Sequence, residues 1–300
     1  MNNSDTLPNK SPTKPKSNSI LSSLLQDRFA TISAVALIIL IFTALFAPQI
    51  SPYEPTKLDL LNRLIPPVIF SDGNSAHLLG TDSLGRDMLS RIIHGTRMSL
   101  TIGVVVVIMT GVFGTAIGML AGYLGGRFDQ IVMRFVDFQA AIPYFLLALT
   151  IMAAIGPGAR NLVIVLTLIS WPIFARYSRG IMLAVKREVY IEAARVSGTS
   201  EFRILLKHAF PNLASPIITL STLELSRIIL SEAGLSFIGL GVQPPDSAWG
   251  LMVAEAHDYV STANWTITLP GLMVMITTLS INIFATWLRR VSDPVQRGRM

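Results

Sequence analysis

The stretch KREVYIEAARVSGTSEFRILLKHAFPN, residues 186–212, is charged and lies between two long apolar runs. Good helix formers occupy residues 192–194, and Gly198 then breaks the pattern as a C-terminal helix cap does. Ser200 is in position to cap a second short helix that ends near Pro211. The pattern predicts a water-exposed unit of two helices joined at a glycine, which we call the elbow.

The composition around the elbow indicates an integral membrane protein. Of the 300 residues 51% are hydrophobic and only 14% are charged, against about 25% charged in a typical soluble domain. Six apolar runs are candidates for helices that cross a bilayer. They cover residues 30–48, 100–123, 131–155 with a kink at Pro143, a run from Asn161 interrupted at Trp171-Pro172, 213–235 and 266–288.

The basic residues predict the orientation of these spans. With a cytoplasmic N-terminus, seventeen of the 24 Lys and Arg residues fall in cytoplasmic segments and six on the opposite side. This distribution follows the positive-inside tendency. Both termini are therefore expected in the cytoplasm of a multi-pass membrane protein. The net charge of +6 is explained by topology and lipid contact, and no nucleic-acid partner is expected.

Several chemistries are disfavoured by residue content. The chain has no cysteine, and its four histidines are scattered without ligand spacing, so no metal site is expected. No Gly-Lys dipeptide occurs, and a phosphate-binding Walker loop requires one. The chain is thus expected to hold no cofactor and to have no catalytic residue.

Small and charged residues inside the spans suggest how the helices pack. Gly114, Gly118 and Gly122 place small residues on one helical face, so a second helix can approach closely. Glu224 and Arg227 lie three residues apart and can neutralise each other or line a pore. Glu232 has no evident partner nearby in sequence, so contact with a pore or another subunit stands beside a structural role.

The elbow resembles the EAA signature of permease subunits of binding-protein-dependent ABC importers. Its Glu192, Ala193, Ala194, Gly198 and Pro211 fall in register with that signature. His208 stands where Ile is usual, and the resulting His-x-x-Pro-Asn pattern resembles the branch that imports peptides and nickel. Phe210 stands where Leu is usual and keeps an apolar side chain there. Further matches to the second, C-type permease of that branch are the residues 80–82, 85–87, 156–158 and 232–241, together with Pro244 and Trp249-Gly250.

The resemblance implies an all-α type I ABC importer permease fold in the cell inner membrane, with six transmembrane helices and cytoplasmic coupling helices. It divides the chain into a flexible cytoplasmic tail (1–29), a first span (30–48), an extracytoplasmic loop (49–97), a core permease domain (98–290) containing the elbow, and a cytoplasmic tail (291–300).

The partners implied by the resemblance are a homologous second permease, two ATP-binding subunits that bind ATP and Mg, and an extracytoplasmic substrate-binding protein. The elbow would dock on an ATP-binding subunit, with Tyr190, Ile191, Phe202 and Leu206 available to fill the interface. On the other side, the docking candidates are Gly80, Asp82, Arg86, Asp87 and Trp249.

The cargo and two other mechanisms stay open at this point. Dipeptides or oligopeptides are the expected cargo, with nickel, metal chelates or glutathione as alternatives within the same family. An ion-coupled secondary transporter would use the charges of the fifth span, but no convincing internal repeat supports one. An intramembrane protease built on Ser236 would need a base, and the final span holds no His or Lys.

Overall fold

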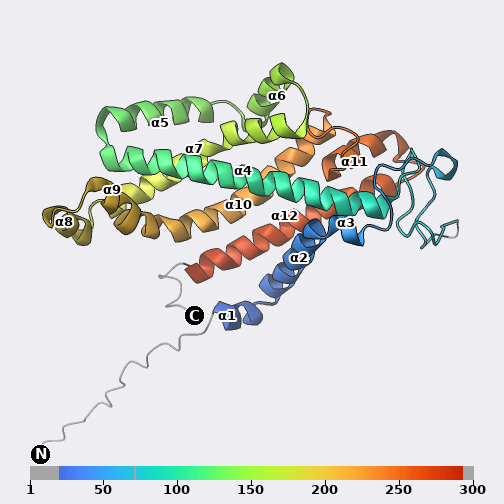
Figure 1. Cartoon of the computed structure of the whole chain (residues 1–300), viewed down its shortest axis with the longest axis horizontal. Helices are drawn as coiled ribbons and strands as arrows, with labels where there is room; N and C mark the ends of the chain where they lie inside the picture. The colour runs from blue at the N-terminus through green and yellow to red at the C-terminus, as the bar shows by residue number, and fades with distance from the viewer. Residues whose placement is uncertain (1–19, 71, 293–300) are drawn as a thin grey trace, which may run out of the picture.

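The computed structural model describes residues 20–70 and 72–292, and long helices run side by side through most of this part (Figure 1). Apart from one isolated bridge between Thr81 and Asp87, the described residues pair no backbone as strands. The helices are α1 (Ile20–Gln26), α2 (Arg28–Leu45), α3 (Ala47–Ile50), η1 (Leu60–Asn62), α4 (Met88–Leu124), α5 (Gly126–Ala140), α6 (Tyr144–Ile155), α7 (Ala159–Val185), α8 (Val189–Val196), α9 (Glu201–Arg203), η2 (Ile204–Ala209), α10 (Phe210–Phe237), α11 (Trp249–Ala256), η3 (His257–Tyr259) and α12 (Trp265–Ser292).

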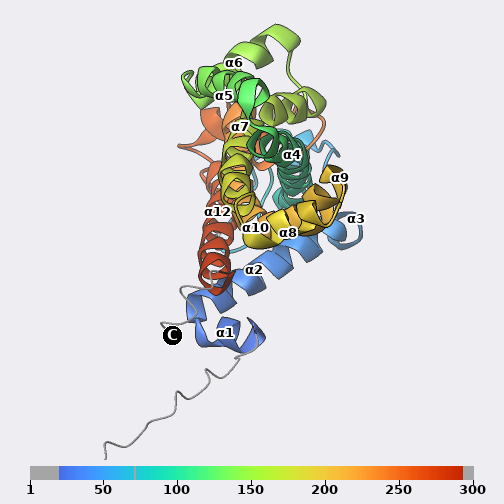
Figure 2. The same ribbon diagram turned by 90° about the vertical axis from the view of Figure 1, so that its left-hand side faces the viewer.

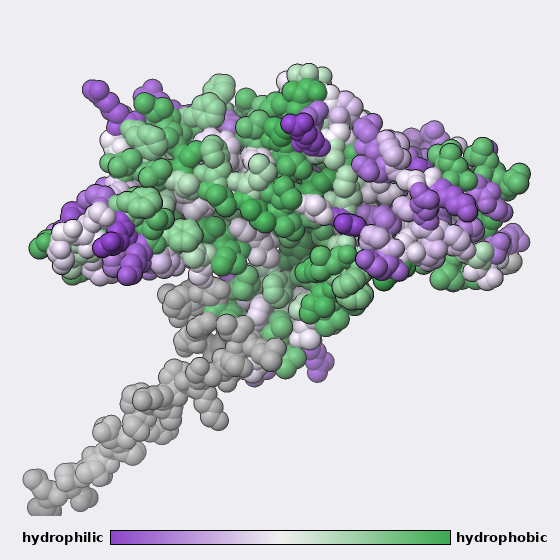
Figure 3. All heavy atoms as spheres, in the orientation of Figure 1, coloured by the Kyte–Doolittle hydropathy of each residue, from purple (hydrophilic) through white to green (hydrophobic). Residues whose placement is uncertain are grey.

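The prediction of a membrane protein is confirmed. Among the described residues, five helical stretches are long and apolar enough to cross a bilayer, and α5 with α6 would supply a sixth crossing if that bent pair acts as one span. Figure 3 shows apolar side chains across the middle of one face and hydrophilic ones gathered at its two ends. We call these the elbow end, which carries α8, and the loop end, which carries α11 and residues 51–87.

The expected kink in the third span is a full break. Helices α5 and α6 meet at 89° instead of forming one bent rod. Pro143 lacks a backbone N–H and disfavours helical geometry at Ile142 before it, so the helix ends at Ala140 and restarts at Tyr144.

The expected interruption at Trp171-Pro172 is wrong, because α7 continues through it. A proline inside a helix leaves the carbonyl four residues earlier without its usual donor. Here that carbonyl belongs to Leu168, and the Gln139 side chain of α5 donates to it at 3.1 Å and to the Ile169 carbonyl at 3.0 Å. A neighbouring helix thus supplies what the proline removes.

The sequence suggested that the second helix of the elbow ends near Pro211, but the helix continues past this residue. Residues 201–237 form one unbroken helical run in which Ile204–Ala209 makes a π-helical turn. This turn shifts the hydrogen-bond register so that Pro211 lies in the first turn of α10, where a missing N–H is tolerated. The elbow is therefore joined directly to the fifth span.

The predicted boundaries of the end segments also change. Residues 20–26 of the expected tail form α1, and the loop predicted over 49–97 ends at Asp87, which caps α4. Helix α12 runs to Ser292, past the predicted start of the C-terminal tail. Residues 1–19 and 293–300 of the two expected tails lie outside the described residues.

The predicted glycine face is confirmed at the contact between α4 and α7, which cross side by side in both views (Figures 1 and 2). A Cβ added at Gly114 would meet the Trp171 carbonyl, and one at Gly118 would overlap the carbonyl of Ala175. One at Gly122 would come within 2.9 Å of the Arg179 carbonyl. The two backbones approach this closely because α4 has no side chain between them.

Replacing Gly118 by Ala should force α4 and α7 apart. Overpacking of this kind costs about 1–3 kcal/mol, so Gly118→Ala is expected to lower the midpoint of thermal unfolding of the detergent-solubilised protein. Gly180→Ala in α7 is the matched control, because a Cβ there meets nothing within 4 Å. Equal midpoints for the two variants would contradict the close approach.

Candidate functional site

The elbow has the predicted glycine turn. Gly198 has φ of +77°, a left-handed conformation that other residues adopt at a cost. Its N–H donates to the Arg195 carbonyl at 3.0 Å, and the N–H of Thr199 donates to the Ala194 carbonyl at 3.1 Å. These two bonds end α8 and turn the chain back toward α9.

One face of the elbow is buried against its own chain. Ile191 is fully buried and packs with Ile204, Leu205 and Leu213. The expectation that Ile191 fills an interface with another subunit is therefore wrong, because α8 needs this side chain to pack on the start of α10.

The other face is exposed and more apolar than the motif alone suggested. Val189, Val196 and Phe202 have 79%, 84% and 71% of their surface exposed, and Tyr190 and Leu206 are also exposed. Of the motif residues, Glu192, Ala193, Gly198 and Pro211 are exposed and Ala194 is half-buried. The elbow thus presents an apolar surface with charged residues around it, as a partner-binding surface does.

Tyr123, at the end of α4, joins the elbow to the core, and sequence reasoning missed it. The Lys186 ammonium donates to the Tyr123 carbonyl and lies 5.6 Å from the centre of the ring. The Arg195 guanidinium lies 5.9 Å from the same ring and donates to its hydroxyl at 3.2 Å. One aromatic ring that contacts two cations therefore links α4 to α8 and to the end of α7.

The charged residues of α10 form separate groups. Glu224 and Arg227 pair as predicted, with 2.6 Å between Glu224 Oε2 and Arg227 Nη2. Glu232 is fully buried and does have a partner nearby in sequence, because the Ser236 hydroxyl donates to it at 2.9 Å. Ser236 also accepts from the N–H of Val242, so this group fastens the turn after α10. The i, i+4 spacing of Glu232 and Ser236 was the available signal.

The loop-end candidates come together, but as a buried network. Asp82 accepts hydrogen bonds from Arg86 Nε and Arg91 Nη1, each at 2.6 Å. Both guanidinium groups also donate to Glu255 Oε2, at 2.8 and 2.6 Å. This ring of four charges ties the loop to α4 and to α11. Arg91 and Glu255 were not anticipated, since nothing in their local sequence indicates a pairing across more than 160 positions.

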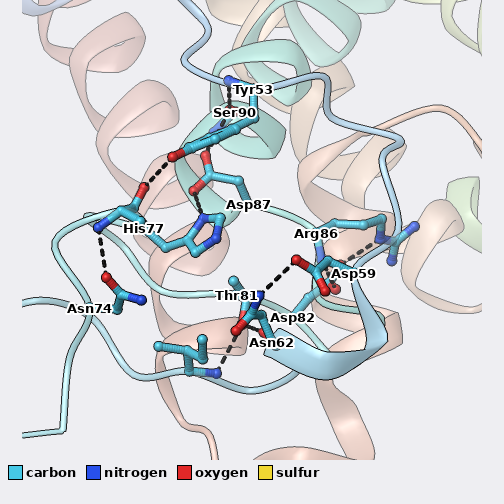
Figure 4. A network of polar contacts seen from close by, with 12 residues as sticks. Tyr53, Asp59, Asn62, Asn74, His77, Thr81, Asp82, Arg86, Asp87 and Ser90 are labelled. Carbon is cyan, nitrogen blue, oxygen red and sulfur yellow. Dashed lines mark hydrogen bonds and ion pairs between the residues drawn. The ribbon is translucent and has the colours of Figure 1, made fainter.

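A second part of the network holds the loop against the start of α4 (Figure 4). Asp87 accepts from the N–H of Ser90 at 2.8 Å and lies 2.9 Å from His77 Nδ1. Nearby, the amide of Asn62 donates to Asp59 at 2.8 Å and lowers the pKa of that carboxyl.

Burial changes the role expected of the loop-end residues. Gly80, Asp82, Arg86 and Asp87 are all buried. Trp249 is fully buried as well, and its indole N–H donates to the Ile92 carbonyl at 3.3 Å. These five residues hold the loop and α11 on the core, and a docking protein would contact their exposed neighbours. Within residues 20–70 and 72–292, no three His, Asp or Glu side chains are placed to hold a metal ion.

Asp82→Asn should loosen the loop. Removing one charge from a buried network leaves the other charges uncompensated, which costs roughly 3 kcal/mol or more. We expect faster proteolysis within residues 51–87 and a lower unfolding midpoint. Asp258→Asn is the control, since Asp258 pairs with His257 at the surface, where such pairs contribute little. Identical cleavage rates would contradict the structural role of the network.

The long apolar helices and the packed core between α4 and α7 define a multi-pass membrane protein with an exposed elbow. The family of binding-protein-dependent transport system inner membrane components matches residues 114–298, and the N-terminal TM domain of oligopeptide transport permease C matches residues 18–67. The chain belongs to this family, which confirms the resemblance seen in the elbow.

Individual relatives agree with the family match. The di/tripeptide transport system permease protein DppC of Pseudomonas aeruginosa (strain UCBPP-PA14) is 40% identical over 86% of this chain and 85% of its own length. The dipeptide transport system permease protein DppC of Haemophilus influenzae is 36% identical over 90% and 91%.

The fold also matches a solved structure. An inward-facing structure of the MetNI methionine ABC transporter has a TM-score of 0.54 at 18% identity, covering 69% of this chain and 98% of that one. At this identity the likeness supports the fold alone, which is that of an ABC importer permease.

Proposed function

We propose that this chain is one of two permeases in an ATP-driven importer of dipeptides and oligopeptides. The observation that carries the proposal is the identity of 36–40% with permeases of dipeptide and di/tripeptide systems over most of both chains. Nickel, metal chelates and glutathione are the alternatives among similar importers, and competition experiments distinguish them.

The energy would come from two separate ATP-binding subunits that bind ATP and Mg, because the sequence has no Gly-Lys for a Walker loop. Their docking site would be the exposed face of the elbow, where Val189, Val196 and Phe202 offer apolar contact beside the charge of Glu192. The elbow continues into α10 without a break and is tied to α4 through Tyr123. A push on the elbow would therefore reach two spans. An ion-coupled carrier has no comparable use for this surface.

The distribution of basic residues supports an orientation with the elbow end and both termini in the cytoplasm. The loop end then faces the extracytoplasmic binding protein. The buried network would act as a rigid support, and docking would use the exposed apolar side chains around it. Leu61 and Ile69 are the strongest candidates, with 96% and 84% of their surface exposed.

The cargo is tested by reconstitution. This permease would be placed in proteoliposomes with its companion permease, its ATP-binding subunits and the binding protein encoded beside it. We expect ATP-dependent uptake of a labelled dipeptide that unlabelled dipeptides reduce and that nickel or glutathione does not. Uptake driven by an ion gradient without ATP would overturn the proposal. If nickel alone reduced uptake, nickel and not a peptide would be identified as the cargo.

Coupling is tested at Gly198. Gly198→Pro fixes φ near −65°, which is incompatible with +77°, and removes the bond to Arg195. The elbow should lose its shape while the spans stay in the membrane. We expect at least a tenfold loss of uptake and of peptide-stimulated ATP hydrolysis at normal membrane abundance. Gly271→Ala is the control, since a Cβ there meets nothing. Normal uptake by Gly198→Pro would refute the docking role.

A further inference from the structure

A cavity of about 740 Å³ opens between the break at Pro143, α7 and α10. Its volume lies within the range of small-molecule sites, roughly 300–1,000 Å³. Most of its wall is apolar, with Leu147, Ile173 and Leu220 among the lining residues. The polar groups include Arg227, Tyr144 and Ser170. An apolar wall with a few converging polar groups is the usual form of a ligand site.

Arg227 is held rigidly at this wall. Glu224 Oε2 accepts from both Nε and Nη2 of Arg227, at 2.8 and 2.6 Å. The guanidinium lies 4.4 Å from the centre of the Tyr144 ring. A guanidinium has five N–H donors, so the single Glu224 oxygen accepts from only some of them. The Arg227 side chain is 38% exposed, while that of Glu224 is 7% exposed and lies behind it.

The depth of Arg227 argues against a role at the membrane surface. It lies ten residues before the end of α10 at Phe237, which is roughly 15 Å along a helix. The hydrocarbon core is about 30 Å thick, so with the end of α10 at the membrane surface the guanidinium would lie near the middle of that core. A lipid headgroup does not reach this depth. A charged residue there usually marks a path for a polar solute.

The guanidinium donors at the cavity favour an anion. The lining residues include two arginines, Arg176 and Arg227, and no Asp or Glu. Arg176 is paired with Asp137 at the surface, with both side chains more than half exposed. Arg227 is also paired, but its partner Glu224 is only 7% exposed and is not a lining residue, so the remaining N–H donors of Arg227 are available to a solute in the cavity. A planar guanidinium matches carboxylate and phosphate groups, and of these two a peptide carries the carboxylate.

We infer that Arg227, fixed by Glu224 and Tyr144, binds the C-terminal carboxylate of the peptide as it passes through this cavity. The inference rests on the proposed peptide cargo. Tyr144 and Ser170, whose hydroxyl oxygens lie 3.2 Å apart, provide the next polar contact along the wall. The apolar residues accept peptide side chains of varied shape. The site therefore recognises the C-terminal carboxylate, which all such peptides share.

The test compares a dipeptide with its C-terminal amide in proteoliposomes holding the complete transporter. The ratio of uptake of acid to amide is measured in the wild type and in Arg227→Gln with the same binding protein, so that protein's own preference cancels. A hydrogen bond to a charged group contributes about 1.5–3 kcal/mol, and the ratio should fall at least tenfold. Arg176→Gln, which changes the other arginine of the wall, should leave the ratio unchanged.

A second variant keeps the test decisive if Arg227→Gln does not accumulate. Glu224→Leu with Arg227→Met removes both charges together, so neither charge is left without its partner, and such a double replacement by apolar residues of similar size is often neutral for stability. The ratio should fall in this variant as well.

The outcomes separate the two proposals. An unchanged ratio in variants that still import peptide overturns the Arg227 inference and leaves the peptide importer intact. An equal loss with acid and amide also overturns it, since lipid or subunit contact would affect both alike. Absence of peptide uptake by the wild type overturns the proposed function itself.

Discussion

The close backbone contact between α4 and α7 is the constraint on which the rest of the structure depends. At Gly114, Gly118 and Gly122 the absence of a side chain lets the two helices touch along their lengths. Lipid tails are as apolar as the helices, so burial of apolar surface gives little reason for helices to associate in a membrane. Van der Waals contact between closely packed helices must therefore stabilise their association. Once α4 and α7 are fixed, α10 packs against both, and the elbow at their common end is positioned with them.

Polar clusters then fasten each end of this packed core. At the elbow end a single ring, Tyr123, contacts both Lys186 and Arg195. At the loop end Asp82 and Glu255 each accept bonds from the same two arginines. The two clusters differ in how much of their surroundings stays exposed. The loop network is mostly buried and joins three segments of the chain, which favours rigidity, whereas the elbow keeps an exposed apolar face.

Local patterns predicted the fold class, the glycine face and the turn at Gly198, because each depends on residues within a few positions of one another. The Glu224–Arg227 pair was found for the same reason. The ring of Arg86, Arg91, Asp82 and Glu255 was not, since it joins helices far apart in the chain. The loop-end motif residues lie near one another at one end of the structure, but sequence does not show that their side chains point inward. The exposure of Val189 and Val196 likewise depends on which face of α8 Ile191 buries.

The two prolines of the middle spans show how one chemical deficiency has opposite consequences. Pro172 leaves the Leu168 carbonyl without its helical donor, and Gln139 supplies one, so α7 stays continuous. At Pro143 the chain turns instead by 89°, and Tyr144 becomes the first residue of α6. That turn brings the Tyr144 ring over Arg227. The two features are close in space, because Gln139 lies one residue before the end of α5 at Ala140. The cavity beside Arg227 is the space that this arrangement leaves open.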